Sequence, residues 1–340
     1  MEYLAVAEAA KKWGISEVQV RKYCRDNRIP SAKYESGVWW IPANSKQPDR
    51  SSLVPKVEVE LPVLAKRIQN QKKKRNFHGL YDYVQIYLTY SSSRMASNRL
   101  TRNQVESIFR KGKVKEAFEP IKVSDCVEVL NHCVCVDFII DRIGEPLTEK
   151  FIQRLHYLLM FGTVDHRKER VVPGVYRNSK VALRFDDISP SKEIADRINL
   201  LISDYEKKTE FDLKHILDFH VSFEKIFPFE DGNGRIGRLI MFKECLRRDI
   251  MPFVIDDKRR KQYIMGIRSW HEDRFELMQV AYAAQERFEK VVALCKLGEY
   301  RSKEFQDMYA CIEQQLPVYE IEDDFEEIQE RTSRSKKKRR

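Results

Sequence analysis

Apolar residues recur along most of the chain at the three- and four-residue spacing of an amphipathic helix. The clearest example is residues 216–226, where Leu217, Phe219, Phe223 and Ile226 follow this spacing. The same pattern predicts helices over residues 77–92, 101–109, 123–142, 147–161, 191–207, 213–226 and 235–247. We therefore expect a mainly α-helical fold for the larger part of the chain.

The first 48 residues show a different pattern, which predicts a small separate module. Helical spacing over residues 6–13 and 17–26 is interrupted by Gly14-Ile15-Ser16, a turn whose serine can cap the second helix. Residues 32–34 and 38–42 flank a Glu-Ser-Gly turn and predict a β-hairpin. This arrangement resembles the winged helix-turn-helix of the MerR and excisionase-like group, in which the second helix enters the major groove of DNA.

Four polar side chains of the second predicted helix are suited to contact DNA: Gln19, Arg21, Lys22 and Arg25. Arginine and glutamine can reach base edges, and lysine can neutralise phosphate. The resemblance implies duplex DNA as a partner and a homodimer that places two heads on neighbouring half-sites. A small helical adaptor that binds protein is the alternative.

Composition supports packed cores in a chain of this length. A chain of 340 residues is long enough for two domains, and a hydrophobic content of 42% supports a packed core. No apolar run approaches the ~18 residues that a membrane span needs, and we identify no signal peptide, so we expect a cytoplasmic protein without a membrane partner. The seven cysteines are odd in number and scattered, which favours reduced thiols. A net charge of +10 points toward polyanionic partners.

Charge and proline content divide the chain into segments. We expect a linker over residues 49–75, between a head at residues 1–48 and a helical domain at residues 76–297. The tail at residues 298–340 is acidic over residues 320–330 and basic over its last ten residues. Two interpretations are open for this tail: a disordered segment whose charged halves attract each other, or a basic end that contacts nucleic acid.

The most informative stretch is residues 227–238, Phe-Pro-Phe-Glu-Asp-Gly-Asn-Gly-Arg-Ile-Gly-Arg. Two glycines flank the asparagine, so the backbone can turn sharply and present N–H groups to an anion at the start of a helix. Asp231 can hold a divalent metal ion, and Arg235 and Arg238 can reach the oxygens of a polyphosphate. The stretch therefore predicts a phosphate-binding turn.

This turn resembles the signature of the Fic family, His-Pro-Phe-x-Asp-Gly-Asn-Gly-Arg-x-x-Arg, at every fixed position except the first. The resemblance extends over about residues 76–297 and implies a helical core with a short β-hairpin, the flap, which aligns a target peptide. Tyr176, Arg177 and Val181 would belong to this flap. The implied reaction is transfer of AMP from ATP to a Ser, Thr or Tyr hydroxyl of a target protein.

The resemblance also assigns roles within the signature. The α-phosphate would lie against Gly232, Asn233 and Gly234, the inner phosphates against Arg235, and the outer phosphate against Arg238. Asp231 would bind Mg²⁺. ATP, or another nucleotide, and Mg²⁺ are thus the expected ligands.

Two positions depart from the family pattern. Phe227 stands where the family has its catalytic histidine, the base that takes a proton from the target hydroxyl, and a phenyl ring cannot carry a proton. Residues 91–101 look like the inhibitory segment of the family, but Ala96 stands where a glutamate would pair with the second arginine. We therefore expect Arg238 to have no internal partner and to be free for a phosphate; the alternative is that another group of the chain fills the gap.

Loss of the base and of its inhibitor together predicts a pseudoenzyme, a nucleotide-binding protein with weak or absent adenylyltransferase activity and a DNA-binding regulatory head. A general base is worth ~10²–10⁴ in rate, so its loss should leave binding intact. His220 precedes Phe227 by about 10 Å along a helix, too far for a substitute base, whereas Glu230 lies in the turn itself. An active transferase with another base or donor, and a non-enzymatic adaptor, are the alternatives.

Overall fold

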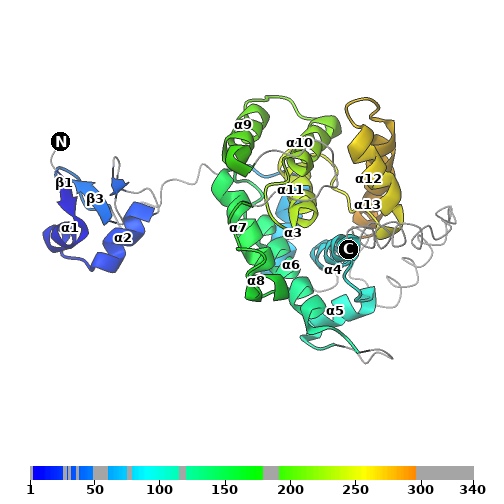
Figure 1. Ribbon diagram of the computed structural model, residues 1–340, viewed down its shortest axis with the longest axis horizontal. Coiled ribbons are helices and arrows are strands. Elements are labelled where there is room, and N and C mark those ends of the chain that lie inside the picture. Colours follow the sequence, from blue (N-terminus) through cyan, green and yellow to red (C-terminus); the bar gives the residue numbers. More distant parts are fainter. Residues whose placement is uncertain are drawn as a thin grey trace, which may run out of the picture. The chain divides into compact units, whose positions relative to one another are not determined.

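The computed structural model describes residues 3–25, 29, 32–35, 38–48, 60–74, 79–114, 120–178 and 191–295 (Figure 1). The chain forms two compact units, Met1–Glu60 and Leu61–Arg340. All three strands of the described residues belong to the first unit, and the regular structure described in the second unit is helical.

The first unit consists of two helices and an antiparallel sheet. Its elements follow the order β1 (Tyr3–Ala5), α1 (Val6–Trp13), α2 (Glu17–Arg25), β2 (Lys33–Glu35) and β3 (Val38–Pro42). Strand β3 is central, with Leu4 opposite Ile41 on one side and Tyr34 opposite Trp39 on the other. Both helices and the β2–β3 hairpin lie where the sequence predicts them. Strand β1 was not predicted, because three residues are too few to show a period.

Local chemistry explains how the two helices of this unit are separated. Gly14 ends helix α1 in the left-handed conformation (φ 65°), which glycine adopts without steric cost. The Ser16 hydroxyl accepts a hydrogen bond from the Gln19 N–H group (3.2 Å) and starts helix α2. Val20 of this helix and Ile41 of strand β3 are buried in one apolar cluster, so the helices pack on the sheet.

The second unit is a bundle of helices. In chain order they are α3 (Val63–Lys73), α4 (Leu80–Met95), α5 (Arg102–Lys111), α6 (Val123–Asp141), α7 (Glu149–Met160), α8 (Val164–Arg167), the 3₁₀ turn η1 (Ser191–Glu193), α9 (Ile194–Glu206), α10 (Leu213–Ile226), α11 (Asn233–Arg247), the 3₁₀ turn η2 (Asp257–Arg259), α12 (Arg260–Ser269) and α13 (Phe275–Leu294). The mainly helical fold is thus confirmed.

Helix α11 lies in the middle of this unit. It contacts helices α3, α4, α6, α7 and α10, and its polar side chains are buried as well as its apolar ones. At its C-terminal end, Arg247 pairs with Glu206 of helix α9 (2.5 Å), and the buried Lys243 donates to Glu244 (2.6 Å). Because charges buried here have partners, the helix is fixed in place together with the turn that precedes it.

Helix starts in the second unit follow the capping chemistry visible in the sequence. The Thr101 hydroxyl accepts from the Gln104 N–H group (3.3 Å), and the Gln104 side chain accepts from the Thr101 N–H group (2.9 Å). The side-chain oxygens of Thr148 and Asp212 cap helices α7 and α10 by accepting from the N–H groups of Phe151 and His215. Capping residues of this kind can be identified in the sequence without knowledge of the tertiary fold.

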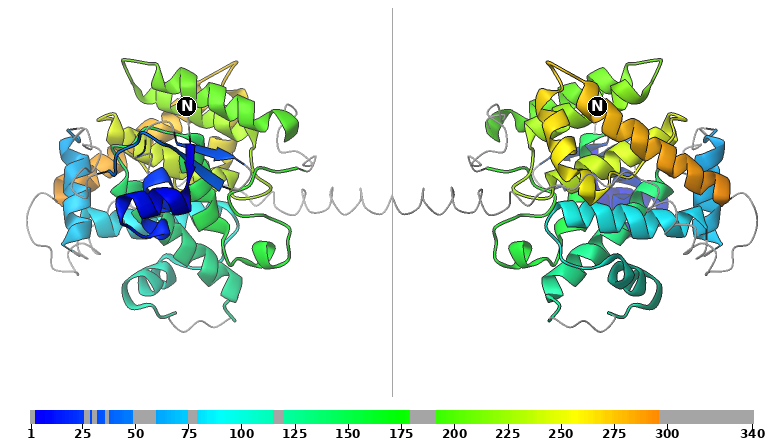
Figure 2. Two further views of the ribbon diagram at one scale, coloured as in Figure 1. Left: turned by 90° about the vertical axis from the view of Figure 1, so that its left-hand side faces the viewer. Right: turned by 90° about the vertical axis from the view of Figure 1, so that its right-hand side faces the viewer.

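The boundary between the two units differs from the expectation of a linker over residues 49–75. Helix α3 occupies part of that range, and its Ala65 and Ile68 are fully buried in the core of the second unit. Arg67 donates a hydrogen bond to the Cys295 carbonyl. Figure 2 shows α3, in light blue, beside the end of α13, in orange. The second unit therefore begins at Leu61.

Some predictions fall outside the described residues. Of the three predicted flap residues, Tyr176 and Arg177 are described and lie outside any strand, whereas Val181 is outside the description. The tail at residues 298–340 and most of the predicted linker are outside it too. Among the helices that the structure describes, none has the length and apolar character needed to cross a membrane.

Candidate functional site

The signature residues form the junction between helices α10 and α11. Phe227 ends helix α10 in the left-handed conformation (φ 50°), and its N–H group donates to the Phe223 carbonyl (3.1 Å). Gly232 (φ 82°) starts helix α11. A Cβ atom on Gly232 would lie 3.1 Å from Leu159 Cδ2, so both conformation and space favour glycine there. The predicted turn from one helix into the next is therefore present.

The Asn233 side chain closes this turn on itself. Its Oδ1 atom accepts from the Phe229 N–H group (2.9 Å), and its Nδ2 atom donates to the Phe229 carbonyl (2.8 Å). The residue is only 2% exposed. In this state the asparagine shapes the turn, and its contact with a phosphate stays a prediction.

His156 of helix α7 packs against the turn, a role that was not predicted from the sequence. Its ring stacks on Phe229 at 3.7 Å between centroids and 4° between planes. Its Nδ1 atom accepts from the Gly174 N–H group (2.9 Å), so its Nε2–H group donates to the Asp231 carbonyl (3.2 Å). Burial lowers the pKa of His156 to about 4, which keeps the ring neutral. A lone histidine inside a helical pattern carries no signal for such a role.

The described part of the predicted flap also contacts the turn. Arg177 donates through its Nε atom to the Phe227 carbonyl (2.7 Å) and through its backbone N–H group to the Pro228 carbonyl (2.9 Å). The ring of Tyr176 lies 5.4 Å from that of Phe229. Two of the three predicted flap residues are thus beside the signature.

Arg235 lies between two carboxylates. Its Nη2 atom bonds to Asp231 Oδ2 (2.9 Å), and its Nη1 atom bonds to Glu128 Oε2 (3.2 Å). The arginine side chain is 5% exposed, and Glu128 comes from helix α6. Burial raises the pKa of the Glu128 carboxyl group, whereas the charge of Arg235 lowers it. No sequence pattern points to Glu128, because only tertiary packing places helix α6 against helix α11.

Arg238 also has a partner inside the protein, so the expectation that it has none was wrong. Its Nε atom donates to the Ser92 hydroxyl (3.1 Å) and its Nη2 atom to the Ser92 carbonyl (3.0 Å). Ser92 belongs to helix α4, which carries the segment that resembles the inhibitory motif. Ala96 follows that helix as its exposed C-cap residue. The segment therefore supplies a hydroxyl and a carbonyl to the arginine where the family pattern has a carboxylate.

The histidines near the turn are already engaged. His220 Nε2 lies 2.6 Å from the Tyr263 hydroxyl, and burial lowers the pKa of His220 to about 3. Both ring nitrogens of His156 bond to backbone groups, and Glu230 accepts from the Asn178 N–H group (3.3 Å). The low pKa values of His156 and His220 make both rings poor acceptors for the proton that a base at position 227 would take.

The start of helix α11 carries groups that can hold an anion and a metal ion. The first amide groups of a helix have no acceptor within it, and they form its positive end. The Asp231 side chain is 55% exposed, and one carboxylate together with substrate phosphates is a common way to hold Mg²⁺. Arg235 and Arg238 would have to exchange Glu128 and Ser92 for phosphate oxygens.

The four predicted DNA contacts lie on helix α2 of the first unit. Arg21 is exposed and pairs with Glu17 one turn earlier (2.6 Å), and Gln19 is half-buried. The side chains of Lys22 and Arg25 are outside the description. DNA contact by this helix stays a prediction.

Comparison with known proteins identifies relatives of the second unit. Residues 146–245 match the model of the Fic/DOC family. A probable protein adenylyltransferase of Aquifex aeolicus (strain VF5) is 28% identical over 104 residues, which cover 30% of this chain and 32% of that protein. The match thus spans about a third of the length of this curated relative.

Solved structures show the same fold at lower identity. A Fic domain containing signaling protein from Bacteroides thetaiotaomicron superposes with a TM-score of 0.54 at 18% identity, covering 68% of this chain and 94% of that one. A Fic family protein from Desulfovibrio desulfuricans superposes with a TM-score of 0.51 at 21% identity, covering 70% and 75%. The second unit therefore contains a Fic/DOC family domain, which the family model places at residues 146–245.

Proposed function

We propose that this chain binds a nucleotide at Asp231–Arg238, transfers AMP poorly or not at all, and acts as a regulator through a DNA-binding first unit. The observation that carries this proposal is the contrast within the turn. The glycines, Asp231 and both arginines are placed around the start of helix α11, whereas the residue before them is Phe227. The groups that would bind phosphate are present, whereas the group that would accept the proton is missing.

The retained groups suit a nucleoside triphosphate as the ligand. The helix start attracts the phosphates, and the arginines on its first two turns can form charge-assisted bonds with phosphate oxygens. Mg²⁺ at Asp231 would neutralise part of the phosphate charge. The relative from Aquifex aeolicus is named as a probable protein adenylyltransferase, which supports ATP as the nucleotide and a protein hydroxyl as the acceptor.

Transfer of AMP also requires that the acceptor hydroxyl lose its proton. Phe227 has no group that can take it, and His156 and His220 are held neutral by burial with their bonds directed elsewhere. Losing a general base costs about 10²–10⁴ in rate and leaves the binding groups in place. These magnitudes favour a protein that senses a nucleotide by binding it and transfers AMP only slowly.

Glu128→Gln is expected to tighten binding of ATP–Mg²⁺. Glutamine keeps the shape of the side chain but removes the charge that competes with phosphate for Arg235. Because a hydrogen bond to a charged group contributes ~1.5–3 kcal/mol, we expect affinity to rise about tenfold in calorimetric titration. Asp141→Asn on the same helix, an exposed carboxylate paired with Lys72, is the matched control and should change nothing.

Arg238→Ala should act in the opposite direction and weaken ATP more than ADP, because its assigned contact is the outermost phosphate. If ATP–Mg²⁺ at millimolar concentration gives no calorimetric heat and no shift of melting temperature in the parent protein, the nucleotide proposal is wrong. If binding is present but Glu128→Gln leaves it unchanged, Arg235 does not contact the phosphates.

The first unit is expected to bind duplex DNA with strong dependence on salt. With about four phosphate contacts, affinity should fall about 10²-fold between 50 and 200 mM salt, because counterions are released from DNA on binding. Fluorescence anisotropy of the full chain on labelled duplex measures this. Arg21→Ala combined with Arg25→Ala should reduce binding, while Lys214→Gln in the second unit removes a charge and should not. Binding that survives the double change but disappears when residues 331–340 are deleted would assign the contact to the basic end.

A further inference from the structure

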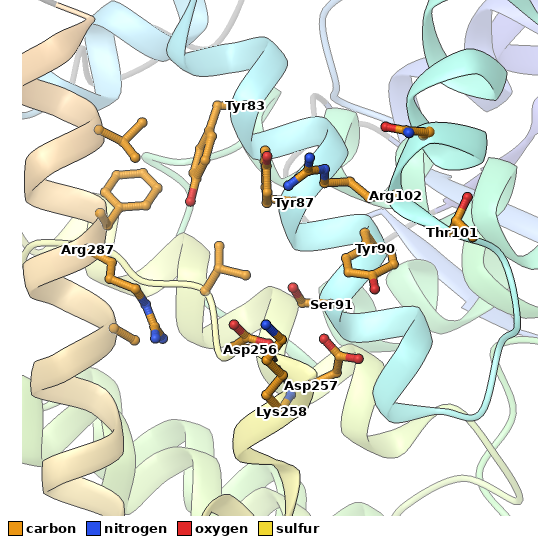
Figure 3. Close-up of a pocket in the computed structure, with 15 residues that line it drawn as sticks. Tyr83, Tyr87, Tyr90, Ser91, Thr101, Arg102, Asp256, Asp257, Lys258 and Arg287 are labelled. Atoms are coloured by element: carbon orange, nitrogen blue, oxygen red, sulfur yellow. Dashed lines mark hydrogen bonds between the residues drawn. The ribbon is translucent and has the colours of Figure 1, made fainter. Parts of the chain in front are cut away.

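A separate cavity of about 340 Å³ lies beside helix α4. The face of α4 that lines it differs from the face that contacts the signature through Ser92. Its walls come from helix α4, the start of helix α5, the segment around Asp256 and Asp257, and helix α13 (Figure 3). No residue of the turn at 227–238 lines it. The volume lies within the ~300–1,000 Å³ range of small-molecule sites.

Arg287 of helix α13 lines this cavity and has an unsatisfied donor. Its Nη2 atom is buried without a hydrogen-bond partner among the described residues. Figure 3 shows its guanidinium group directed into the cavity, toward the side where Asp256 lies. A buried guanidinium nitrogen without a partner is costly, so the cavity favours a ligand that brings an anionic group to Arg287.

Two carboxylates line the cavity beside this arginine. Asp256 Oδ1 accepts from the Lys258 N–H group (3.0 Å), and Asp257 pairs with Arg94 (3.5 Å). Asp256 and Arg287 share the cavity but form no direct ion pair in the described structure. A ligand that satisfies both must carry, besides its anionic group, a hydroxyl or amine that donates to Asp256.

The remaining walls are aromatic. Tyr83 and Tyr87 stack on each other (4.4 Å between centroids), Tyr90 follows on the same helix, and Phe288 packs edge-on against Tyr83 (5.8 Å). Arg102 lies over the Tyr87 ring (5.3 Å) and adds a positive charge at this wall. Rings already packed against each other offer a flat ring of the ligand apolar contact with little loss of side-chain freedom.

We propose that this cavity binds a nucleoside monophosphate. Its phosphate would pair with Arg287, a ribose hydroxyl would donate to Asp256, and its base would contact the tyrosine wall. An amino acid also carries an anionic group and a donor, but it would leave most of 340 Å³ empty and the aromatic wall uncovered. This site is independent of the signature, so it stands whether or not the turn binds ATP.

Calorimetric titration of the full chain with AMP tests the proposal. Arg287→Gln should weaken AMP at least tenfold. Lys290→Gln is the matched control, because it removes the same charge from an exposed position of the same helix, where Lys290 pairs with Glu286 (3.0 Å). Arg238→Ala, which changes the signature instead, should leave the Arg287-dependent binding in place.

Two further probes separate the parts of the ligand. Inorganic phosphate and adenosine should each bind at least tenfold more weakly than AMP. Phosphate that binds as tightly as AMP would reduce the site to an anion site and overturn the nucleotide assignment. Absence of AMP binding, or AMP binding that Arg287→Gln does not change, would overturn the proposal altogether. If Arg287→Gln fails to fold, Arg287→Lys keeps the charge without the planar fork and should still weaken AMP.

Discussion

Replacing Phe227 with histidine should raise the rate of AMP transfer from ATP about 10²–10⁴-fold, the usual contribution of a positioned general base. The surrounding turn is already built, with the backbone of Phe227 held by Arg177 and by the end of helix α10. Phe227 has a left-handed backbone (φ 50°), which histidine adopts more readily than most residues, so the change adds no backbone strain. The measurement is incorporation of labelled AMP into the protein itself or into lysate proteins.

Phe227→Leu is the matched control, because it alters the side chain without supplying a proton acceptor. It should leave the rate at the level of the parent. The Phe227→His, Glu128→Gln double variant should transfer faster than Phe227→His at subsaturating ATP, because Arg235 is then released to the nucleotide. A parent protein that already transfers AMP as fast as Phe227→His would contradict the pseudoenzyme interpretation and favour another base, with Glu230 the first to substitute.

What the sequence predicted of the site is its local part. A glycine at a left-handed position and a capping residue at a helix start determine the structure of only a few neighbouring residues. The turn and most helices could therefore be predicted from the amino-acid sequence. The family domain was predicted from the resemblance of residues 227–238 to the Fic signature. The family match then confirmed the domain over residues 146–245.

What the sequence did not predict depends on contacts between distant segments. Glu128 and Ser92 reach the two arginines from helices α6 and α4, and His156 reaches the turn from helix α7. None of these residues lies near the signature in the chain, and single polar residues in helices have many possible roles. The apolar spacing of Leu61, Leu64, Ala65 and Ile68 did contain the signal for helix α3, but the neighbouring serine- and proline-rich stretch concealed it.

Acidification from about pH 6.5 to 4.5 should cost the protein about 4 kcal/mol of unfolding free energy. Burial lowers the pKa of His132 to about 3, of His156 to about 4 and of His220 to about 3. In the unfolded chain these groups titrate near 6.5. Below that pH the unfolded state takes up protons that the folded state cannot, so stability falls as pH decreases toward the folded pKa values.

The size of this effect follows from the number of protons. Each histidine contributes about 1.4 kcal/mol per pH unit within the window. Asp82, whose pKa burial raises to about 6, acts in the opposite direction, because the folded state then binds a proton before the unfolded state does. The raised pKa of Glu128 acts likewise. We therefore expect a net loss of about 2 kcal/mol per pH unit, a large part of the ~5–15 kcal/mol that stabilises a typical domain. Urea unfolding at several pH values measures it.

His132→Leu isolates one of the three histidines. His132 Nδ1 lies 3.0 Å from the Thr89 hydroxyl, and its Nε2 atom is buried without a hydrogen-bond partner among the described residues. Leucine cannot titrate, so the dependence of unfolding free energy on pH should become shallower by about 1.4 kcal/mol per pH unit, whatever the variant does to stability at pH 7. His271→Gln, at an exposed position, should keep the slope of the parent. Equal slopes for His132→Leu and the parent would mean that His132 gains its proton in the folded state, and that the core around helices α4 and α6 admits water.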